Sequence, residues 1–430
     1  MFEVREKPEM VERALLVRLS FNRREEDDDI SLLEELGELV STLGIGVVSL
    51  ELAWSRAMHR KYLCGTGKAA EIVELALAHE CDCIVFDNQL APSQQREWEE
   101  LAQICVIDRE EVILDIFAKR AQTKEATLQV DLARMQYALP RMARMWNHLD
   151  REGGAGAGGG GGASRGMGEM QVEVDRRLAR KRIDRTKREL EAVRSQRATR
   201  RKDREKNDTP HAAIVGYTNS GKSTLLNILS GSDIMAKDML FATLDTTTRS
   251  IELPDGQTLL LTDTVGFVRN LPHRLVEAFK ATLEEAVLAD FLIHVLDASD
   301  PRALEFFETT MDVLNELGAE GKPMITVLNK VDKVEDSKIL DNLQEKLEHT
   351  LLLSAKEGLG LDELRQQCTV MLADRVRSHC YRIPQSRGEL SAILHKEAKV
   401  MSTEYEGNDV LITAIVPAII AGRLAEFICD

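Results

Sequence analysis

The chain contains 430 residues, of which 43% are hydrophobic and 30% are charged, a composition typical of soluble globular proteins. It is too long for one core of ordinary size, and at about 150 residues per domain it should form roughly three domains. The net charge of −16 excludes a surface that is basic throughout. A polyanionic partner would therefore have to be bound by one element of the protein.

The termini and the cysteines favour a cytoplasmic protein. The first residues are charged and contain no apolar segment, and the apolar stretch 411–422 is short and contains Pro417, so neither a signal peptide nor a membrane span is expected. The seven cysteines show no CxxC spacing for zinc and are expected to be buried thiols in a reducing compartment. We expect a monomer in the cytoplasm and leave open a peripheral association with a membrane.

Residues 1–110 alternate short apolar runs with helical patterns, which predicts a small α/β domain with a parallel sheet. The predicted strands are 15–19, 47–52, 83–86 and 104–107, with helices over 32–43 and from Lys68. The run from Gly65 to Lys68 resembles a phosphate-binding loop. We interpret it as a turn and helix start, because Ala69 replaces the hydroxyl that a metal ion would need.

Residues 111–206 predict a long helical hairpin. From Glu111 the pattern favours one long helix, with an apolar stripe at spacings of three or four formed by Leu128, Leu132, Met135, Leu139, Met142 and Met145. The partner helix, 169–206, would run back beside it. Its apolar positions are sparse: Val174, Leu178, Ile183, Leu190 and Val193. Residues 176–206 contain 15 Lys or Arg and 5 Asp or Glu, a local charge of +10, which leaves −26 for the rest of the chain.

A glycine-rich segment, 153–168, joins the two predicted helices. So many glycines lose too much backbone entropy to hold regular structure, so we expect a loop. Its composition fits a flexible linker, and equally a mobile loop at the hairpin tip that inserts between phosphates or bases, with Arg151 and Arg165 beside it. The residues leave both interpretations open.

The next segment, 207–373, begins with the apolar strand 212–215 and the sequence GYTNSGKST before an apolar helix. Two glycines separated by four residues, followed by Lys and Ser, let backbone N–H groups surround a phosphate at a helix N-terminus. Lys222 would reach the β and γ phosphates, and the Ser223 hydroxyl would be a Mg²⁺ ligand. The predicted phosphate-binding residues are Gly216, Tyr217, Thr218, Asn219, Ser220, Gly221, Lys222, Ser223 and Thr224.

A predicted hairpin follows, with strands 249–253 and 258–262 and a turn at Pro254, Asp255 and Gly256. Its second strand ends in Asp263, Thr264, Val265 and Gly266. Asp263 is placed to hold Mg²⁺ through a water molecule, and the Gly266 N–H to meet the γ phosphate.

Three further apolar strands, 291–296, 324–328 and 351–353, complete the predicted sheet. The second ends in Asn329, Lys330, Val331 and Asp332, and the third in Ser354, Ala355 and Lys356. A carboxylate at Asp332 would accept from N1–H and the exocyclic amine of guanine, for which adenine has no matching donors. Because these motifs follow one another in order at strand ends, the predicted ligand is GTP.

The last part of the chain, 374–430, predicts a small α+β domain with the order βαββα. The expected elements are a strand at 381–383, a helix through Leu390 and Leu394, strands at 399–405 and 409–416, and a helix from Pro417. His395 is interpreted as a helix surface residue without a chemical role.

Taken together, these motifs resemble the HflX-type GTPases of the Obg and HflX group of translation-associated GTPases. The resemblance rests on GYTNSGKSTLLN, FATLDTTTR at 241–249, DTVGFVRNLP at 263–272, NKVD, SAK, and GGASRGMGEMQVEVDRR before the basic helix. It covers essentially the whole chain. The implied fold is an α/β protein with a P-loop GTPase domain at 207–373, preceded by an α/β domain at 1–110 and the hairpin at 111–206, and followed by the domain at 374–430.

The resemblance also implies roles for residues. Ser223 and Thr243 would ligate Mg²⁺, and Lys222, Thr243 and Gly266 would act in catalysis. The implied first switch consists of Phe241, Ala242, Thr243, Leu244 and Asp245. Asp263 to Gly266 would form the second switch, and the segments at Asn329 and Ser354 would surround the base.

The family acts on the large ribosomal subunit, and its members can split ribosomes. The resemblance therefore implies that the hairpin and the N-terminal domain bind ribosomal RNA, with no DNA partner, and that the glycine loop lies near the peptidyl-transferase region. Met167 stands where the family usually has proline, and this replacement should loosen the free loop.

Phe267 occupies the position where Ras-like proteins have a water-orienting glutamine. A phenyl ring cannot hydrogen-bond to the attacking water. We therefore expect slow GTP hydrolysis by the protein alone and an active site that is completed by the ribosomal partner. The alternative is a GTP-controlled RNA-binding or assembly factor in which hydrolysis only resets binding. A tRNA-modifying GTPase ranks lower, because Cys429 is followed only by Asp430 and lacks the short motif expected around a reactive cysteine.

Overall fold

A computed structural model describes residues 11–144, 163–206, 209–231, 240–241, 246–271, 285–373 and 376–429. The chain forms two compact units. The first comprises residues up to Ser195 together with the segments that contain Phe241 and Arg269. The second comprises the remainder of the chain.

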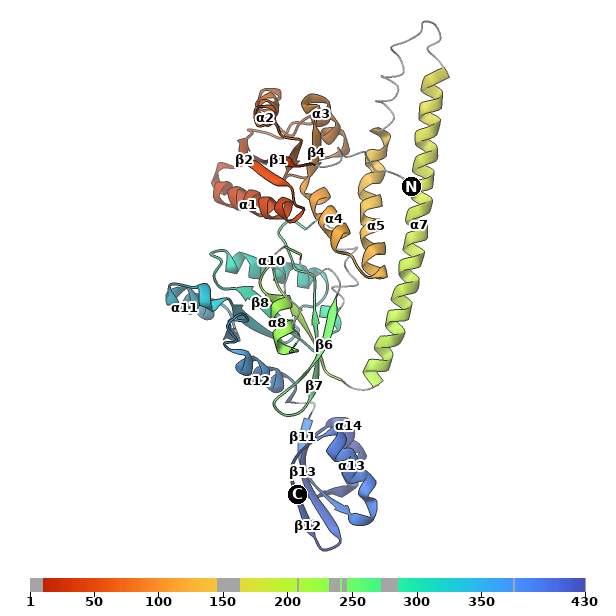
Figure 1. Cartoon of the computed structure of the whole chain (residues 1–430), viewed down its shortest axis with the longest axis vertical. Coiled ribbons are helices and arrows are strands. Elements are labelled where there is room, and N and C mark those ends of the chain that lie inside the picture. The colour runs from red at the N-terminus through yellow and green to blue at the C-terminus, as the bar shows by residue number, and fades with distance from the viewer. Residues whose placement is uncertain are drawn as a thin grey trace. The chain divides into compact units, whose positions relative to one another are not determined.

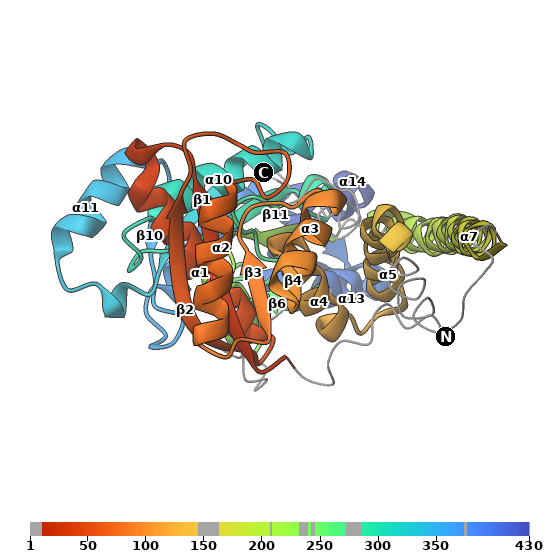
Figure 2. The ribbon, with the colours of Figure 1, turned by 90° about the horizontal axis from the view of Figure 1, so that it is seen from above.

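The first unit contains a four-stranded parallel sheet in the order β2-β1-β3-β4. Its strands are β1 (Arg13–Ser20), β2 (Gly46–Trp54), β3 (Cys83–Phe86) and β4 (Cys105–Asp108). The helices are α1 (Glu26–Thr42), α2 (Thr66–Ala78), α3 (Pro92–Ala102) and α4 (Arg109–Arg120). Helices α2 and α3 cover one face and α1 and α4 the other (Figures 1 and 2). The predicted parallel sheet is confirmed.

Two details of this unit bear on the sequence predictions. Helix α2 begins at Thr66 after Gly65, so the run from Gly65 to Lys68 is a helix start, as predicted. Helix α3 was not predicted, because it has few apolar residues. Its core-facing side combines fully buried Trp98 with Gln95, whose amide donates to the carbonyl oxygen of Val106 over 2.6 Å.

The prediction of one long helix from Glu111 is wrong. Helix α4 ends at Arg120, and α5 (Lys124–Ala138) begins after an extended residue, Thr123. The Thr123 hydroxyl accepts from the N–H of Ala126 over 3.2 Å, which satisfies a free donor of the new helix. A short 3-10 helix, Leu139–Arg144, follows α5.

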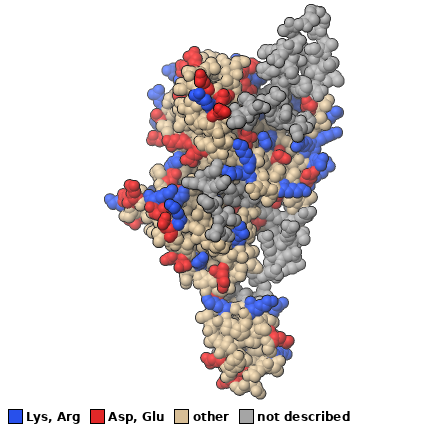
Figure 3. All heavy atoms as spheres, viewed as in Figure 1, with Lys and Arg blue, Asp and Glu red and all other residues tan. Residues whose placement is uncertain are grey.

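Helix α7 (Ala163–Lys206) runs beside α5 in the opposite direction (Figure 1). The two pack through one apolar cluster, formed by Leu128, Leu132, Met135, Leu139, Ile183 and Leu190. This confirms the pairing expected for the hairpin, with Met142 and Met145 outside the residues whose side chains are described. Val174 and Leu178 stay 36% and 41% exposed, as the sparse apolar pattern of this helix predicted. On the face shown in Figure 3, Lys and Arg side chains gather over α7.

Helix α7 begins inside the glycine-rich segment, so the prediction that 153–168 holds no regular structure is wrong for 163–168. Each glycine in a helix costs about 1 kcal/mol relative to alanine, whereas the Glu, Met and Arg residues that follow are good helix formers. Extending an existing helix avoids the cost of nucleating a new one. Residues 153–162 lie outside the described part of the chain.

The second unit has a six-stranded sheet in the order β10-β9-β8-β5-β7-β6, in which only β6 and β7 pair antiparallel. Its strands are β5 (His211–Val215), β6 (Thr247–Glu252), β7 (Thr258–Asp263), β8 (Phe291–Asp297), β9 (Met324–Asn329) and β10 (Thr350–Leu352). Its helices are α8 (Lys222–Leu229), α10 (Ala303–Glu316), α11 (Ser337–Lys346) and α12 (Leu361–Met371). The predicted hairpin and strand order along the chain are confirmed.

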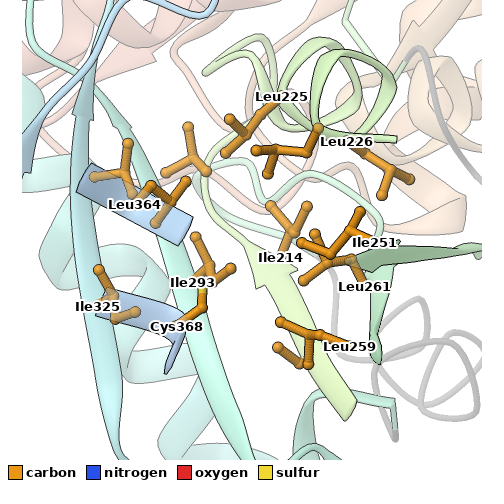
Figure 4. Packing of buried hydrophobic residues seen from close by; sticks show 14 of the residues in the cluster. Ile214, Leu225, Leu226, Ile251, Leu259, Leu261, Ile293, Ile325, Leu364 and Cys368 are labelled. Carbon is orange, nitrogen blue, oxygen red and sulfur yellow. The ribbon is translucent and has the colours of Figure 1, made fainter. Parts of the chain in front are cut away.

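The core of this sheet surrounds β5 and fixes the start of α8. Figure 4 shows Leu225 and Leu226 of α8 near Ile214 of β5, with Ile251 and Leu261 from the hairpin. All five side chains are at most 4% exposed. The loop between β5 and α8 is therefore held at both ends by packing.

The C-terminal part of the second unit is a four-stranded antiparallel sheet in the order β12-β13-β11-β14. The elements are β11 (Val376–Pro384), α13 (Gly388–Glu397), β12 (Lys399–Glu406), β13 (Asp409–Pro417), α14 (Ala418–Arg423) and β14 (Ile428–Cys429). The βαββα order was predicted, and the two-residue strand β14 adds to it. His395 is exposed on α13, as expected. The α/β fold class with an α+β end is thus confirmed.

All seven cysteines are free thiols, four of them buried and three half-buried. Within the described ranges, no group of three or more His, Cys, Asp or Glu side chains could hold a metal ion by itself. No helix in the described part of the chain is both long enough and apolar enough to cross a membrane.

Candidate nucleotide-binding site

The loop between β5 and α8 requires glycine at both of its ends. Gly216 has φ +146°, and a Cβ there would lie 2.2 Å from the carbonyl oxygen of Val295. Gly221 has φ +99°, and a Cβ there would lie 2.3 Å from Nδ2 of Asn329. The spacing that suggested a phosphate loop therefore has a steric cause in the neighbouring strands.

Lys222, the first residue of α8, carries a buried amine. Its Nζ donates to the carbonyl oxygen of Tyr217 over 2.7 Å, and the side chain crosses back beneath the loop. Burial lowers the pKa of Lys222 to about 8, although the nearby Asp263 carboxylate acts in the opposite direction. A bound phosphate would restore the preference for the charged amine.

Ser223 and Asp263 bring two oxygen ligands together. The Ser223 Oγ donates to Oδ2 of Asp263 over 2.6 Å, across 40 residues of sequence. A hydroxyl and a carboxylate are the hard donors that Mg²⁺ binds, so these residues fit the predicted ion. Thr243, the other predicted ligand, lies outside the described residues, as do Ala242, Leu244 and Asp245.

The predicted second switch lies against the phosphate loop. A Cβ on Gly266 would be 2.7 Å from Cα of Thr218 and 3.0 Å from Nζ of Lys222, so only glycine fits without displacement. The Phe267 carbonyl accepts from the N–H of Thr218 over 2.8 Å, and its own N–H donates to Gly216 over 3.2 Å. The Phe267 ring is 1% exposed, so this position offers no side-chain hydrogen bond to water.

Asn329 joins the phosphate loop to the predicted base-binding loops. Its Nδ2 donates to the carbonyl oxygen of Ser220 over 2.8 Å, and its Oδ1 accepts from the N–H of Ala355 over 3.0 Å. One side chain at the end of β9 thus connects segments more than 100 residues apart in sequence. The resemblance implied that the segment at Asn329 surrounds the base, and these two contacts come from the structure.

Asp332 is held by the loop that follows β10. The Ser354 Oγ donates to its Oδ1 over 2.5 Å, and this bond keeps the pKa of Asp332 below its usual value. The carboxylate is exposed and charged at neutral pH, as an acceptor for guanine must be. Lys330, at φ +61°, forms an ion pair with Asp297 over 2.7 Å.

The described site residues therefore converge at the carboxyl ends of β5, β7, β9 and β10. Within this set, direct hydrogen bonds connect Ser223 with Asp263, Ser220 with Asn329, and Asp332 with Ser354. Thr264 faces the strand, since its hydroxyl donates to the carbonyl oxygen of Ile214. The Lys356 side chain is 80% exposed and lies 4.0 Å from Glu357. The binding and catalytic roles assigned to these residues remain predictions.

Two residues near the phosphate loop escaped the sequence reasoning. The ring of Phe306, on α10, stacks on Tyr217 with centroids 3.9 Å apart and an interplanar angle of 8°. His294, on β8, is fully buried, and burial together with the Lys222 charge lowers its pKa to about 3. The only signal for His294 was a titratable residue within the otherwise apolar run FLIHVL.

The chain is similar to known proteins along its length. Three family descriptions match consecutive parts of the chain: GTP-binding GTPase N-terminal at 31–118, GTP-binding GTPase middle region at 120–204, and 50S ribosome-binding GTPase at 211–330. The chain is 61% identical to GTPase HflX of Akkermansia muciniphila over 436 residues, covering 100% of both chains. It is 43% identical to GTPase HflX of Escherichia coli, covering 88% of this chain and 87% of that one. A crystal structure of a GTP-binding protein from Sulfolobus solfataricus in complex with GDP matches 84% of this chain and 99% of that chain, at 24% identity and a TM-score of 0.42.

Proposed function

Because the chain belongs to the HflX family of GTPases, we propose that it hydrolyses GTP while bound to the large ribosomal subunit, and that this cycle splits or rescues ribosomes. Its GTPase domain belongs to the 50S ribosome-binding GTPases. The observation that carries the proposal is the combination of this domain with the basic helix α7. Seven of the Lys and Arg side chains on α7 are exposed: Arg177, Arg180, Lys181, Arg182, Arg185, Lys187 and Arg188.

In the proposed reaction, the phosphate loop and the start of α8 hold the β and γ phosphates, with Lys222 neutralising their charge. Ser223 and Asp263 would hold Mg²⁺, directly and through water, and the ion would supply further positive charge to the transferring phosphoryl group. The close packing of Gly266 against Thr218 and Lys222 supports a role for its N–H as a donor to the γ phosphate. Water attacks the phosphorus directly, and no covalent intermediate forms.

The attacking water lacks a side-chain partner at position 267, because the Phe267 ring is buried and apolar. We therefore propose that intrinsic hydrolysis is slow and that the ribosome accelerates it by ordering the switches and excluding bulk water. Turnover of GTP should rise strongly when large subunits are added and little when small subunits are added. Equal turnover with and without large subunits would contradict this proposal.

A non-hydrolysable GTP analogue separates two versions of the cycle. If hydrolysis drives splitting, the analogue should bind ribosomes and leave them unsplit. If GTP occupancy alone positions the hairpin and hydrolysis only resets it, the analogue should split ribosomes once and remain bound. Sedimentation of ribosomes with GTP, GDP and the analogue distinguishes these outcomes.

A further inference from the structure

Arg269, which follows the predicted second switch, is buried against helix α1. Its Nε lies 3.0 Å from Oε2 of Glu35, and its Nη1 lies 3.0 Å from Oδ1 of Asp28. Its Nη2 donates to the hydroxyl of Ser31 over 2.8 Å. All three partners belong to α1, so the planar guanidinium is held by directed contacts from one helix of the N-terminal sheet domain.

Helix α4 holds the backbone of the same residue. Arg109 donates through Nη2 to the carbonyl oxygen of Arg269 over 3.1 Å, and the same guanidinium pairs with Glu35 and with Asp87. The side chains of Arg269, Glu35 and Arg109 are 9%, 6% and 4% exposed. Burying a guanidinium costs desolvation free energy, which the side chain would avoid by facing water. An arginine that is buried and paired in this way is therefore held in a fixed position.

The connection to the nucleotide site runs through the chain itself. Only Val268 separates Arg269 from Phe267, and Val268 is 1% exposed. Phe267 in turn exchanges backbone hydrogen bonds with the phosphate loop at Gly216 and Thr218. Along the chain, a shift of Gly266 and Phe267 can therefore reach Arg269 and its contacts with α1 and α4 through one buried residue.

We propose that Arg269 is a positioning residue for GTP hydrolysis, which fixes the end of the second switch on α1 and links the state of the nucleotide to the N-terminal domain. The proposal goes beyond the ribosomal function and rests only on the GTPase activity. It can therefore be tested without ribosomes, and failure of ribosome binding or splitting would leave its outcome unchanged. By thermodynamic linkage, the coupling is reciprocal. If a GTP analogue changes the stability of the contacts between Arg269 and α1, those contacts change the affinity for the analogue by the same factor.

The test variant is Arg269→Met, which keeps a long side chain and removes the guanidinium. Glu35 retains its partner Arg109, and the Asp28 side chain is already 56% exposed, so no carboxylate is left buried alone. The matched control is Arg18→Met. Arg18 is 15% exposed and pairs with Asp29 and Asp87 in the same domain, and neither ion pair involves residue 269.

We expect Arg269→Met to lower kcat for GTP hydrolysis without ribosomes by about tenfold, because a misplaced switch costs rate more than affinity. The affinity for GDP should stay within about twofold, and Arg269→Lys should recover part of the rate. Arg18→Met should leave kcat near that of the wild type even where it lowers the melting temperature. An unchanged kcat in Arg269→Met, or an equal fall in both variants, would overturn the proposal.

Hydrogen exchange of backbone amides tests the link to α1 directly. If Arg269 only stabilised the fold, its replacement would not remove a difference in exchange between nucleotide states. In the wild type, amides of α1 around Asp28 to Glu35 should exchange at different rates with GDP and with a non-hydrolysable GTP analogue. This difference should disappear in Arg269→Met and persist in Arg18→Met. If Arg269→Met does not fold, Glu35→Gln serves instead, since it keeps the side-chain shape and weakens the contact from the side of α1. Persistence of the nucleotide-dependent difference in the variants of Arg269 or Glu35 would overturn the proposed link.

Discussion

Lys222 must be charged to hold phosphate, yet burial disfavours its charge. Its pKa is lowered to about 8, mainly by desolvation, so the free site loses its positive charge as the pH rises through this value. Bound phosphates raise the pKa again, so nucleotide binding should take up protons near pH 8. We therefore expect Lys222 to be both a phosphate contact and a source of pH dependence.

We predict that GDP binds about fourfold more weakly at pH 8.5 than at pH 7, because only the protonated amine binds well. Calorimetry in buffers of different ionisation enthalpy should detect proton uptake. Lys222→Met should lose about 2–4 kcal/mol of binding free energy and most of the pH dependence in this range. If Lys222→Met kept this pH dependence of GDP binding, a group other than Lys222 would be its cause.

The exposed carboxylate of Asp332 should select the base. We predict that Asp332→Asn weakens GTP binding and improves binding of xanthosine triphosphate, because the new amide places a donor against the guanine donors and suits the xanthine oxygen. Competition between the two nucleotides measures the change. Asp341→Asn, an equal change at an exposed position on α11, serves as the control. Undiminished preference for GTP in Asp332→Asn would contradict the assignment.

At the scale of elements, strand β8 contains a polar residue that its surroundings do not satisfy. Neither ring nitrogen of His294 has a hydrogen-bond partner in the described part of the chain, and its nearest aromatic neighbour is Phe307, with centroids 5.1 Å apart. The folded state keeps this histidine neutral with a pKa of about 3, against 6.5 for the ordinary group. Between these values the unfolded chain binds more protons, so folding stability falls as the pH drops.

We predict that His294→Leu raises the free energy of unfolding at both pH 5 and pH 8, and raises it more at pH 5. The leucine removes two unpaired buried nitrogens and the proton linkage while nearly keeping the volume. Denaturant unfolding at both pH values measures the difference, with His395→Leu on the surface of α13 as the control. An equal change in the free energy of unfolding at both pH values would mean that packing, rather than protonation of His294, causes the change.

The elements that could be predicted from the sequence are those whose burial follows a simple period. Strands β5, β8 and β9 are covered on both faces and read as continuous apolar runs. Helix α3 could not be recognised in this way, because a buried glutamine contributes to its inner face. The break between α4 and α5 is marked by the hydroxyl cap at Thr123, which lies before the apolar stripe and leaves no sign in its period.

The same distinction applies to the candidate site. Motifs at strand ends were predictable, because parallel strands bring their carboxyl ends to one edge of a sheet. The contacts between loops were not, since the bond from Asn329 to Ser220 joins positions 109 residues apart. Arg269 was also missed, because its partners on α1 lie more than 230 residues earlier in the chain.

At the scale of the whole molecule, positive charge is concentrated in one helix of an acidic protein. The net charge is −16 although α7 contributes a large positive share. Binding to RNA should therefore depend on this helix, because the negative charge of the remaining surface repels RNA. Within the described part of α7, the salt bridges include the exposed pair of Arg185 with Glu189. Among the described side chains of this helix, the exposed cations other than Arg185 are therefore available to phosphates.

We predict that replacing Arg177, Lys181 and Arg188 with glutamine makes binding to large subunits less dependent on salt. Each phosphate contact contributes about 0.7–0.9 to the slope of log K against log salt, so three lost contacts should reduce the slope by about 2. Glutamine has nearly the helix propensity of the residues it replaces, so α7 should persist. The control replaces three exposed lysines elsewhere, Lys338, Lys346 and Lys396, with glutamine and changes the net charge equally. If both triple variants shift the slope alike, the effect comes from net charge and α7 is only a solvated strut.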